Sequence, residues 1–91
     1  MKEENVDQKK DILVRINRIE GQVKGIGKMV DKGSCCKDVL VQIAAVRAAI
    51  NKVGALILEN YATDCMINTM EEGNSKEKIE DLISTLTMFL K

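Results

Sequence analysis

Apolar residues in the first third of the chain recur at the spacing of one helix face. Their successive steps are 4, 3, 4, 3 and 4, and the positions are Ile12, Ile16, Ile19, Val23, Ile26 and Val30. The pattern predicts a helix over about residues 6–32. Gly33 is expected to end this helix, and Ser34 is expected to cap the next one.

A second and longer helix is predicted over about residues 35–69, where Gly54 is the only glycine and proline is absent. Its apolar positions are Val39, Leu40, Ile43, Val46, Ile50, Val53, Ile57, Tyr61 and Met66. At about 1.5 Å per residue such a helix spans on the order of 50 Å, which a lone domain of this size cannot cover. We therefore expect a second copy of the chain to cover the apolar stripe.

A short third helix is predicted over about residues 75–90, after the break Glu71-Glu72-Gly73-Asn74. Asn74 and Glu77 have the spacing of a capping box. The expected buried positions are Ile79, Leu82, Ile83, Leu86, Phe89 and Leu90. The fold class is thus all-α, with residues 1–91 forming one domain of three helices around a long central one.

The composition agrees with helix seams packed by aliphatic side chains. Of the 91 residues 45% are hydrophobic, yet there is no Pro or Trp and only one Tyr and one Phe. We expect no apolar run to approach the roughly 20 residues of a membrane span, and residues 1–5 are too polar for an export signal. The chain is expected to be cytoplasmic, with no membrane partner.

The net charge of zero conceals a division along the chain. Residues 1–52 hold 11 Lys/Arg against 7 Asp/Glu, whereas residues 53–91 hold 3 against 7. In the basic half, positions at helical spacing form two sets: Arg15, Arg18 and Gln22, and Lys24 and Lys28. Such a face has two interpretations. It binds a polyanion, or it is an ordinary solvated helix surface.

The chain has three cysteines and no histidine. The absence of histidine removes the usual general base, the usual zinc partner and the His-activated nucleophiles. An odd cysteine count argues against a disulfide scaffold and for thiols that are packed, metal-bound or reactive. Cys36 and Cys65 are 29 positions apart, which is roughly 43 Å along one helix. If two long helices pair antiparallel, Cys36 of one protomer meets Cys65 of the other, twice per dimer.

Position gives the three thiols different expected roles. Cys35 and Cys36 lie in the first turn of the long helix, which favours a thiolate, so Cys36 is the expected nucleophile. Cys65 follows Asp64 and is the expected resolving thiol. A cysteine packed as a small hydrophobe is the alternative. Two thiolates suit linear Cu(I), but only Asp64 and Tyr61 lie near enough to complete a zinc site, so neither zinc nor a cofactor is predicted.

Two segments of the chain resemble the copper-sensitive operon repressor (CsoR/RcnR) family closely, and the resemblance extends over nearly the whole chain. They are R-I-N-R-I-E-G-Q-V-K-G-I at residues 15–26 and C-K-D-V-L-V-Q-I-A-A-V-R-A-A-I at residues 36–50. The resemblance implies a bacterial cytosolic repressor of three helices. It also implies an antiparallel dimer forming a four-helix bundle, which assembles as a dimer of dimers, and a cross-subunit inducer site that controls operator binding.

The resemblance also implies a role for the two matching cysteines. In the copper-sensing branch, a Cys at the position of Cys36 joins a His and a Cys four residues apart, and here those two positions are Tyr61 and Cys65. Tyr61 removes the third Cu(I) ligand, and the branches that use further histidines are excluded. What remains resembles the persulfide-sensing, CstR-like branch, in which Cys36 and Cys65 form a redox pair. Cys35 has no matched role.

The same resemblance assigns the basic residues to DNA. Arg15, Arg18 and Gln22 match operator-contacting positions, Lys52 falls at another basic contact, and Lys24 and Lys28 extend the face. The expected partners are operator double-stranded DNA, further copies of the chain, and low-molecular-weight persulfides or polysulfides as inducer. One alternative is a Cu(I) sensor that uses Cys36 and Cys65. A thiol carrier or sulfurtransferase is the alternative of another class, although no catalytic base is at hand.

Overall fold

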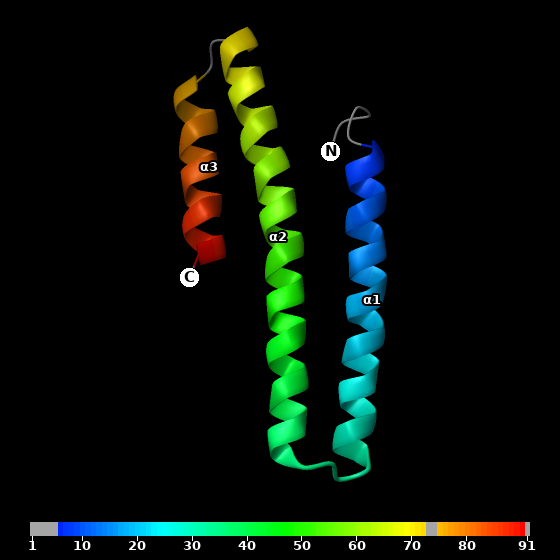
Figure 1. Cartoon of the computed structure of the whole chain (residues 1–91). Helices are drawn as coiled ribbons and strands as arrows, with labels where there is room; N and C mark the ends of the chain where they lie inside the picture. The colour runs from blue at the N-terminus through cyan, green and yellow to red at the C-terminus, as the bar shows by residue number, and fades with distance from the viewer. Residues whose placement is uncertain (1–5, 73–74, 91) are drawn as a thin grey trace. The chain divides into compact units, whose positions relative to one another are not determined.

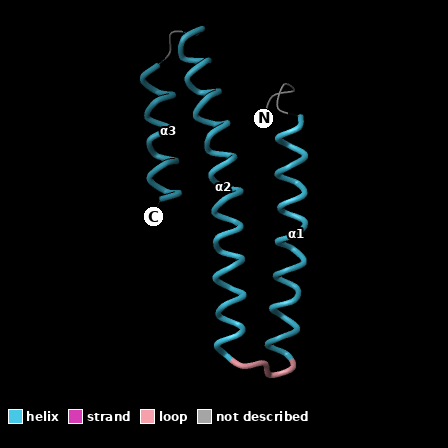
Figure 2. The backbone as a smooth tube through the Cα atoms, viewed as in Figure 1, coloured by secondary structure: helices cyan, strands magenta, loops and turns pink. Residues whose placement is uncertain are grey.

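The computed structural model describes the backbone of residues 6–72 and 75–90, and the side chains of residues 7–67 and 76–90. Within these ranges the chain is entirely helical apart from the short connection at residues 32–35 (Figure 2). The helices are α1 (Val6–Asp31), α2 (Cys36–Glu72) and α3 (Ser75–Leu90), as Figure 1 shows. The predicted fold class, all-α with a long central helix, is confirmed.

The end of α1 is a Schellman motif centred on Gly33. Gly33 has a φ of 77°, its N–H donates to the Val30 carbonyl at 3.2 Å, and the Ser34 N–H donates to the Met29 carbonyl at 2.9 Å. These two bonds satisfy carbonyls that the end of a helix leaves without partners. Gly33 therefore ends α1 as expected, because a left-handed φ suits glycine.

The start of α2 differs from the sequence-based expectation. The first backbone bond of this helix runs from the Val39 N–H to the Cys35 carbonyl at 3.1 Å, which makes Cys35 the residue at the N-cap position. Ser34, the expected cap, instead belongs to the end of α1. At its other end α2 continues through Glu72, so the expected break at Glu71 and Glu72 is wrong. Gly73 and Asn74, and with them the expected capping box, lie outside the described residues.

The chain forms two compact units. One contains α1 and α2 as far as Val53, with α1 antiparallel to this first part of α2 (Figure 1). The other begins at Gly54 and contains the rest of α2 with α3, which folds back along it. The continuous helix α2 is shared by both units, and each candidate site described below lies inside one of them.

Few apolar side chains are buried within one chain. The buried hydrophobic residues of the described part are Ile12, Ile19, Val53 and Cys65. Many apolar seam positions are exposed within one chain, including Ile16, Val23, Val30, Leu40, Ile43, Ile50, Ile57 and Met66, and so are Ile79, Ile83, Phe89 and Leu90, which were expected on the buried face of α3. The exposed positions of α2 form part of the stripe that we expect a second copy to cover. A single chain therefore leaves many apolar side chains in contact with solvent, at a cost in free energy that burial against another surface would remove.

By length and composition, α2 is able to cross a membrane. The segment Cys36–Ile67 is long and apolar enough to do so, and only 6% of its most apolar stretch is buried. The expectation that no apolar run approaches this length is therefore wrong. Arg47 and Lys52 interrupt the apolar residues between positions 39 and 58 without making the stretch polar on average. A helix that is apolar on most sides is found either in membranes or in the core of an assembly.

Candidate functional site

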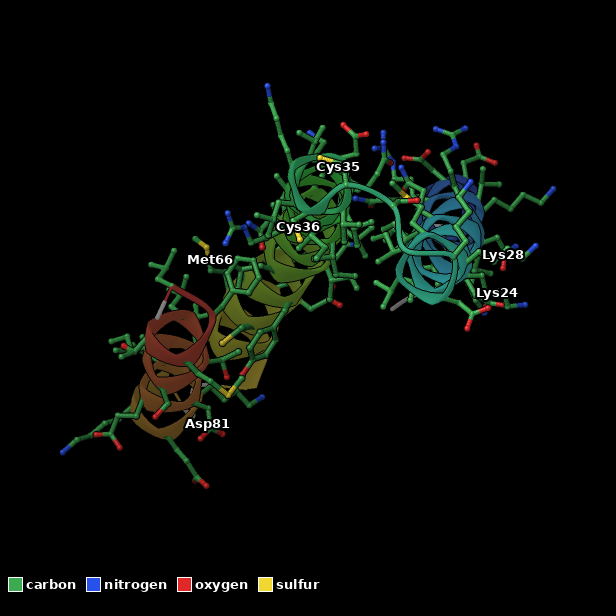
Figure 3. The ribbon with its side chains drawn as sticks, turned by 90° about the horizontal axis from the view of Figure 1, so that it is seen from below. Lys24, Lys28, Cys35, Cys36, Met66 and Asp81 are labelled. Carbon is green, nitrogen blue, oxygen red and sulfur yellow. The ribbon has the colours of Figure 1, made fainter. Side chains whose placement is uncertain are left out.

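The thiols of Cys35 and Cys36 are exposed at the start of α2. Figure 3 shows the two side chains projecting from different sides of the helix. Cys36 lines a surface hollow of about 590 Å³ with Val30, Gly33, Ser34, Val39 and Leu40. The neighbouring cysteines therefore face different surroundings, and Cys36 is the one beside the turn between the helices.

Cys65 lies in the second unit and is buried, with 7% of its surface exposed. Its Sγ–H donates a hydrogen bond to the backbone carbonyl of Lys78 in α3, with an Sγ to oxygen distance of 3.3 Å. A hollow of about 210 Å³ leads to it, lined by Tyr61, Asp64, Lys78 and Asp81. The structure thus places Tyr61 beside Cys65, as their four-residue spacing predicts.

The two thiols of the predicted pair are not brought together by one helix. Cys36 is the first residue of α2 and Cys65 lies 29 positions further along the same continuous helix. All three cysteines are free thiols. Any bond between Cys36 and Cys65 therefore requires a second chain, as the helix length predicts.

The described residues also lack a group of three His, Cys, Asp or Glu side chains that could hold a metal ion. Within this part of one chain, two carboxylates and one thiol line the hollow at Cys65 without converging on a common point. A metal ion at this thiol would need ligands from outside the described side chains.

Asp64 and Asp81 make the approach to Cys65 acidic, although Lys78 lines it too. We expect Asp81→Asn to raise the labelling rate of Cys65 by the anionic reagent iodoacetate, relative to neutral iodoacetamide, by about twofold, because a nearby carboxylate repels an anion. Peptide mass spectrometry measures both rates. Glu80→Gln removes an exposed carboxylate that does not line the hollow and is the control. An equal change in both variants would contradict a local effect of Asp81.

Two of the basic residues predicted to face DNA form ion pairs within α1. The Arg15 Nε donates to both carboxylate oxygens of Asp11 at 3.2 Å, and the Lys24 Nζ lies 3.5 Å from a Glu20 carboxylate oxygen. Both pairs join residues four apart on an exposed helix face and are worth little in stability. Asp11 and Glu20 compete with any polyanion for these two cations. The four-residue spacing between each acid and its base is the sequence signal from which the pairs could have been predicted.

The remaining basic residues of this set, Arg18, Lys28 and Lys52, are exposed and form no ion pair with another residue of the described ranges. Figure 3 shows Lys24 and Lys28 next to each other on one side of α1. Gln22 is different, because its side-chain oxygen Oε1 is buried and has no hydrogen-bond partner among the described groups.

Comparison with known proteins identifies the kind of molecule. Residues 8–88 match the family model of the metal-sensitive transcriptional repressors. The copper-sensing transcriptional repressor CsoR of Bacillus subtilis (strain 168) is 39% identical over 84 residues, which are 92% of this chain and 83% of that protein.

Two solved structures share the fold. The crystal structure of the copper-sensing repressor CsoR with Cu(I) from Geobacillus thermodenitrificans is similar over 100% of this chain and 92% of its own, with a TM-score of 0.85 and 36% identity. The nickel-responsive transcriptional regulator InrS covers 88% of this chain and 90% of its own, with a TM-score of 0.79 and 35% identity.

These comparisons show that the chain is a transcription regulator. Its structure has an exposed, cationic first helix and cysteines at the start and near the end of a long second helix. It belongs to the CsoR/RcnR family of metal-sensitive transcriptional repressors. Members of this family are regulators and not enzymes, which excludes the sulfurtransferase alternative.

Proposed function

We propose that the protein represses transcription by binding operator DNA as a homodimer or homotetramer, and that oxidation of a Cys36/Cys65 pair between protomers releases the DNA. The observation that supports this most directly is the arrangement of the thiols. One is exposed at the start of α2, the other lies near its end beside Tyr61, and no described group of metal ligands accompanies either.

The exposed apolar surface supports the assembly. Side chains such as Leu40, Ile43, Ile50 and Ile57 are 43–63% exposed along α2, and in a soluble protein they would be covered by another copy. Antiparallel pairing of two α2 helices would cover this surface and bring Cys36 of one protomer to Cys65 of its partner. A DNA-binding regulator acts in the cytoplasm. We therefore propose that a second copy of the chain, and not a membrane, covers the apolar face of α2.

The proposed chemistry uses a low-molecular-weight persulfide, RSSH, or a polysulfide as the oxidant. The Cys36 thiolate attacks the outer sulfur, RSH leaves, and Cys36 carries a persulfide. Cys65 of the partner then attacks the Cys36 Sγ and expels H₂S, which leaves a disulfide. The two thiols lose two electrons and the persulfide is reduced to RSH and H₂S. A second persulfide equivalent would supply the additional sulfur of a trisulfide.

Copper is the second candidate inducer, and the functions of the relatives favour it. The Bacillus and Geobacillus proteins are copper-sensing repressors that are 39% and 36% identical to this chain. Cys36 and a partner's Cys65 would supply two soft sulfur ligands for Cu(I). The residue at the third position is Tyr61, whose phenol is a poorer ligand for Cu(I) than a histidine imidazole. This substitution is the reason that we place the persulfide first.

The proposed DNA contacts are Arg15, Arg18, Lys24, Lys28 and Lys52, together with Gln22, whose side-chain Nε2 would be the hydrogen-bond donor. These contacts would be mainly to phosphates, whose recognition is salt-dependent. Selection of genomic fragments by the reduced protein, followed by sequencing, tests the repressor function. We expect enrichment of a small set of promoter fragments whose binding weakens steeply with salt. Uniform recovery of all fragments would contradict an operator-specific repressor.

A further inference from the structure

Cys65 is buried because α3 covers it. In α2, the residue that follows Cys65, Met66, is 64% exposed, whereas Cys65 is 7% exposed. The thiol is directed toward α3 and donates its proton to the Lys78 carbonyl. The side of α2 that carries Cys65 is therefore closed by a helix that begins only ten positions further along the chain, at Ser75.

A second contact holds the other end of α3 on α2. The Phe89 ring lies directly against the backbone of Gly54, so a Cβ at Gly54 would lie 2.7 Å from the Phe89 Cζ. Any side chain at position 54 would therefore displace the ring. Glycine therefore allows this close approach of the ring, because it has no Cβ.

The two contacts are in register. Gly54 and Cys65 are eleven positions apart on α2, and Lys78 and Phe89 are eleven positions apart on α3. Eleven residues are close to three full turns, so both contacts lie on the same face of each helix. The thiol contact and the ring contact therefore hold α3 on α2 at two points.

An apolar groove lies between these two points. It has a volume of about 250 Å³, is open to solvent, and is lined by Ile57, Leu58, Tyr61, Thr85 and Met88 together with the Gly54 and Phe89 pair. Tyr61 lines this groove as well as the hollow at Cys65. Because α3 has exposed apolar side chains such as Ile83 and Met88, we expect it to belong to the less stable part of the fold.

Reactions of the Cys65 thiol are incompatible with its hydrogen bond to α3. Alkylation, disulfide formation and metal binding all remove the Sγ proton that is donated to Lys78. A disulfide also requires the Cβ of the second cysteine to come within about 4 Å of the Cys65 Cβ, on a side now occupied by α3. Docking of α3 and modification of Cys65 therefore oppose each other, and by linkage each disfavours the other by the same factor.

We propose that α3 is a thiol-gated cover. It docks on α2 through the Cys65–Lys78 hydrogen bond and the Phe89–Gly54 contact. It must open for a partner's Cys36, or for a reagent larger than the hollow at Cys65, to reach the thiol, and it docks less favourably once the Cys65 proton is replaced. This inference rests on the proposed function, in which Cys65 reacts with the inducer. In that case α3 is the first element to change position when Cys65 reacts.

The test measures α3 opening directly in the full-length reduced protein, without DNA or inducer. Hydrogen exchange of residues 76–90 reports docking, and the rate of Cys65 labelling by a neutral maleimide too bulky for the hollow of about 210 Å³ at Cys65 reports opening. We expect Phe89→Ala to raise both rates by about tenfold, and Gly54→Ala to act in the same direction because its Cβ displaces the ring. Leu90→Ala, which removes a 76% exposed side chain from the same helix end, is the control and should match the unmodified sequence.

The thiol itself is tested by a matched pair of variants. Cys65→Ala, and alkylation of Cys65, should raise α3 exchange about three- to tenfold, which is the effect of one lost hydrogen bond. Cys65→Ser keeps an O–H donor and should stay within about twofold of the parent. Equal labelling rates in the parent, Phe89→Ala and Gly54→Ala, or unchanged α3 exchange after alkylation, would overturn the cover. Failure of a persulfide to release DNA would instead refute the proposed inducer and leave these exchange results intact.

Discussion

Arg18→Glu is expected to lower the affinity for operator DNA by about 100-fold or more at 0.1 M salt. Arg18 is exposed on α1 and forms no ion pair with another described residue, whereas Arg15 and Lys24 are partly neutralised by Asp11 and Glu20. Reversal of this charge replaces an attraction to phosphate by a repulsion, and a tetramer repeats the change four times. Fluorescence anisotropy with a labelled promoter fragment measures the affinity, and its dependence on salt should become shallower.

Lys76→Glu is the matched control for this experiment. It makes the same change of charge at an exposed position on α3, outside the proposed DNA face, so a smaller loss is expected from the altered net charge alone. Equal losses in the two variants would mean that only total charge matters, and Arg18 would then be removed from the proposed contacts.

Cys36→Ala and Cys65→Ser are each expected to abolish the release of DNA by a persulfide donor while the untreated proteins bind the operator normally. Each substitution removes one of the two sulfurs of the proposed cross-link, so the covalent dimer cannot form. Anisotropy before and after anaerobic treatment measures the effect. In the parent protein, treatment should weaken binding at least about tenfold, the lower end of what an allosteric coupling commonly gives.

Cys35→Ala is the control for the cysteine variants, since Cys35 is an exposed thiol directly beside Cys36 but projects from another side of α2 (Figure 3). It should respond to the persulfide as the parent does. Loss of the response in Cys35→Ala would show that the reacting thiol is not Cys36 alone. Loss of operator binding by untreated Cys36→Ala or Cys65→Ser would contradict a role confined to sensing.

The helices were predictable from the sequence because their signals are local. Apolar spacing defined α1, α2 and α3, and Gly33 defined the end of α1 through its positive φ. The boundary at Ser34 was less predictable, because one residue can serve either the end of one helix or the start of the next. Backbone bonds to Met29 and Cys35 decide between the two.

The candidate site was predictable only in part. The proximity of Tyr61 to Cys65 follows from their spacing on one helix, as do the ion pairs of Arg15 and Lys24. The contact of Cys65 with the Lys78 carbonyl was not predictable, because it depends on the register between α2 and α3 and involves a backbone atom. The burial of α3 was overestimated, because Ile79, Ile83 and Phe89 are exposed within one chain.

The most direct test of the proposed switch is the intact mass of the protein under denaturing, non-reducing conditions after anaerobic treatment with a persulfide donor. A parallel sample receives Cu(I), and the affinity for promoter DNA is measured on both. The account predicts a covalent dimer of about twice the 10.1 kDa chain mass, with or without added sulfur, and loss of DNA affinity in the persulfide sample. A chain of unmodified monomer mass, with DNA released only by Cu(I), would contradict it and identify a copper sensor in which Tyr61 has not disabled the metal site.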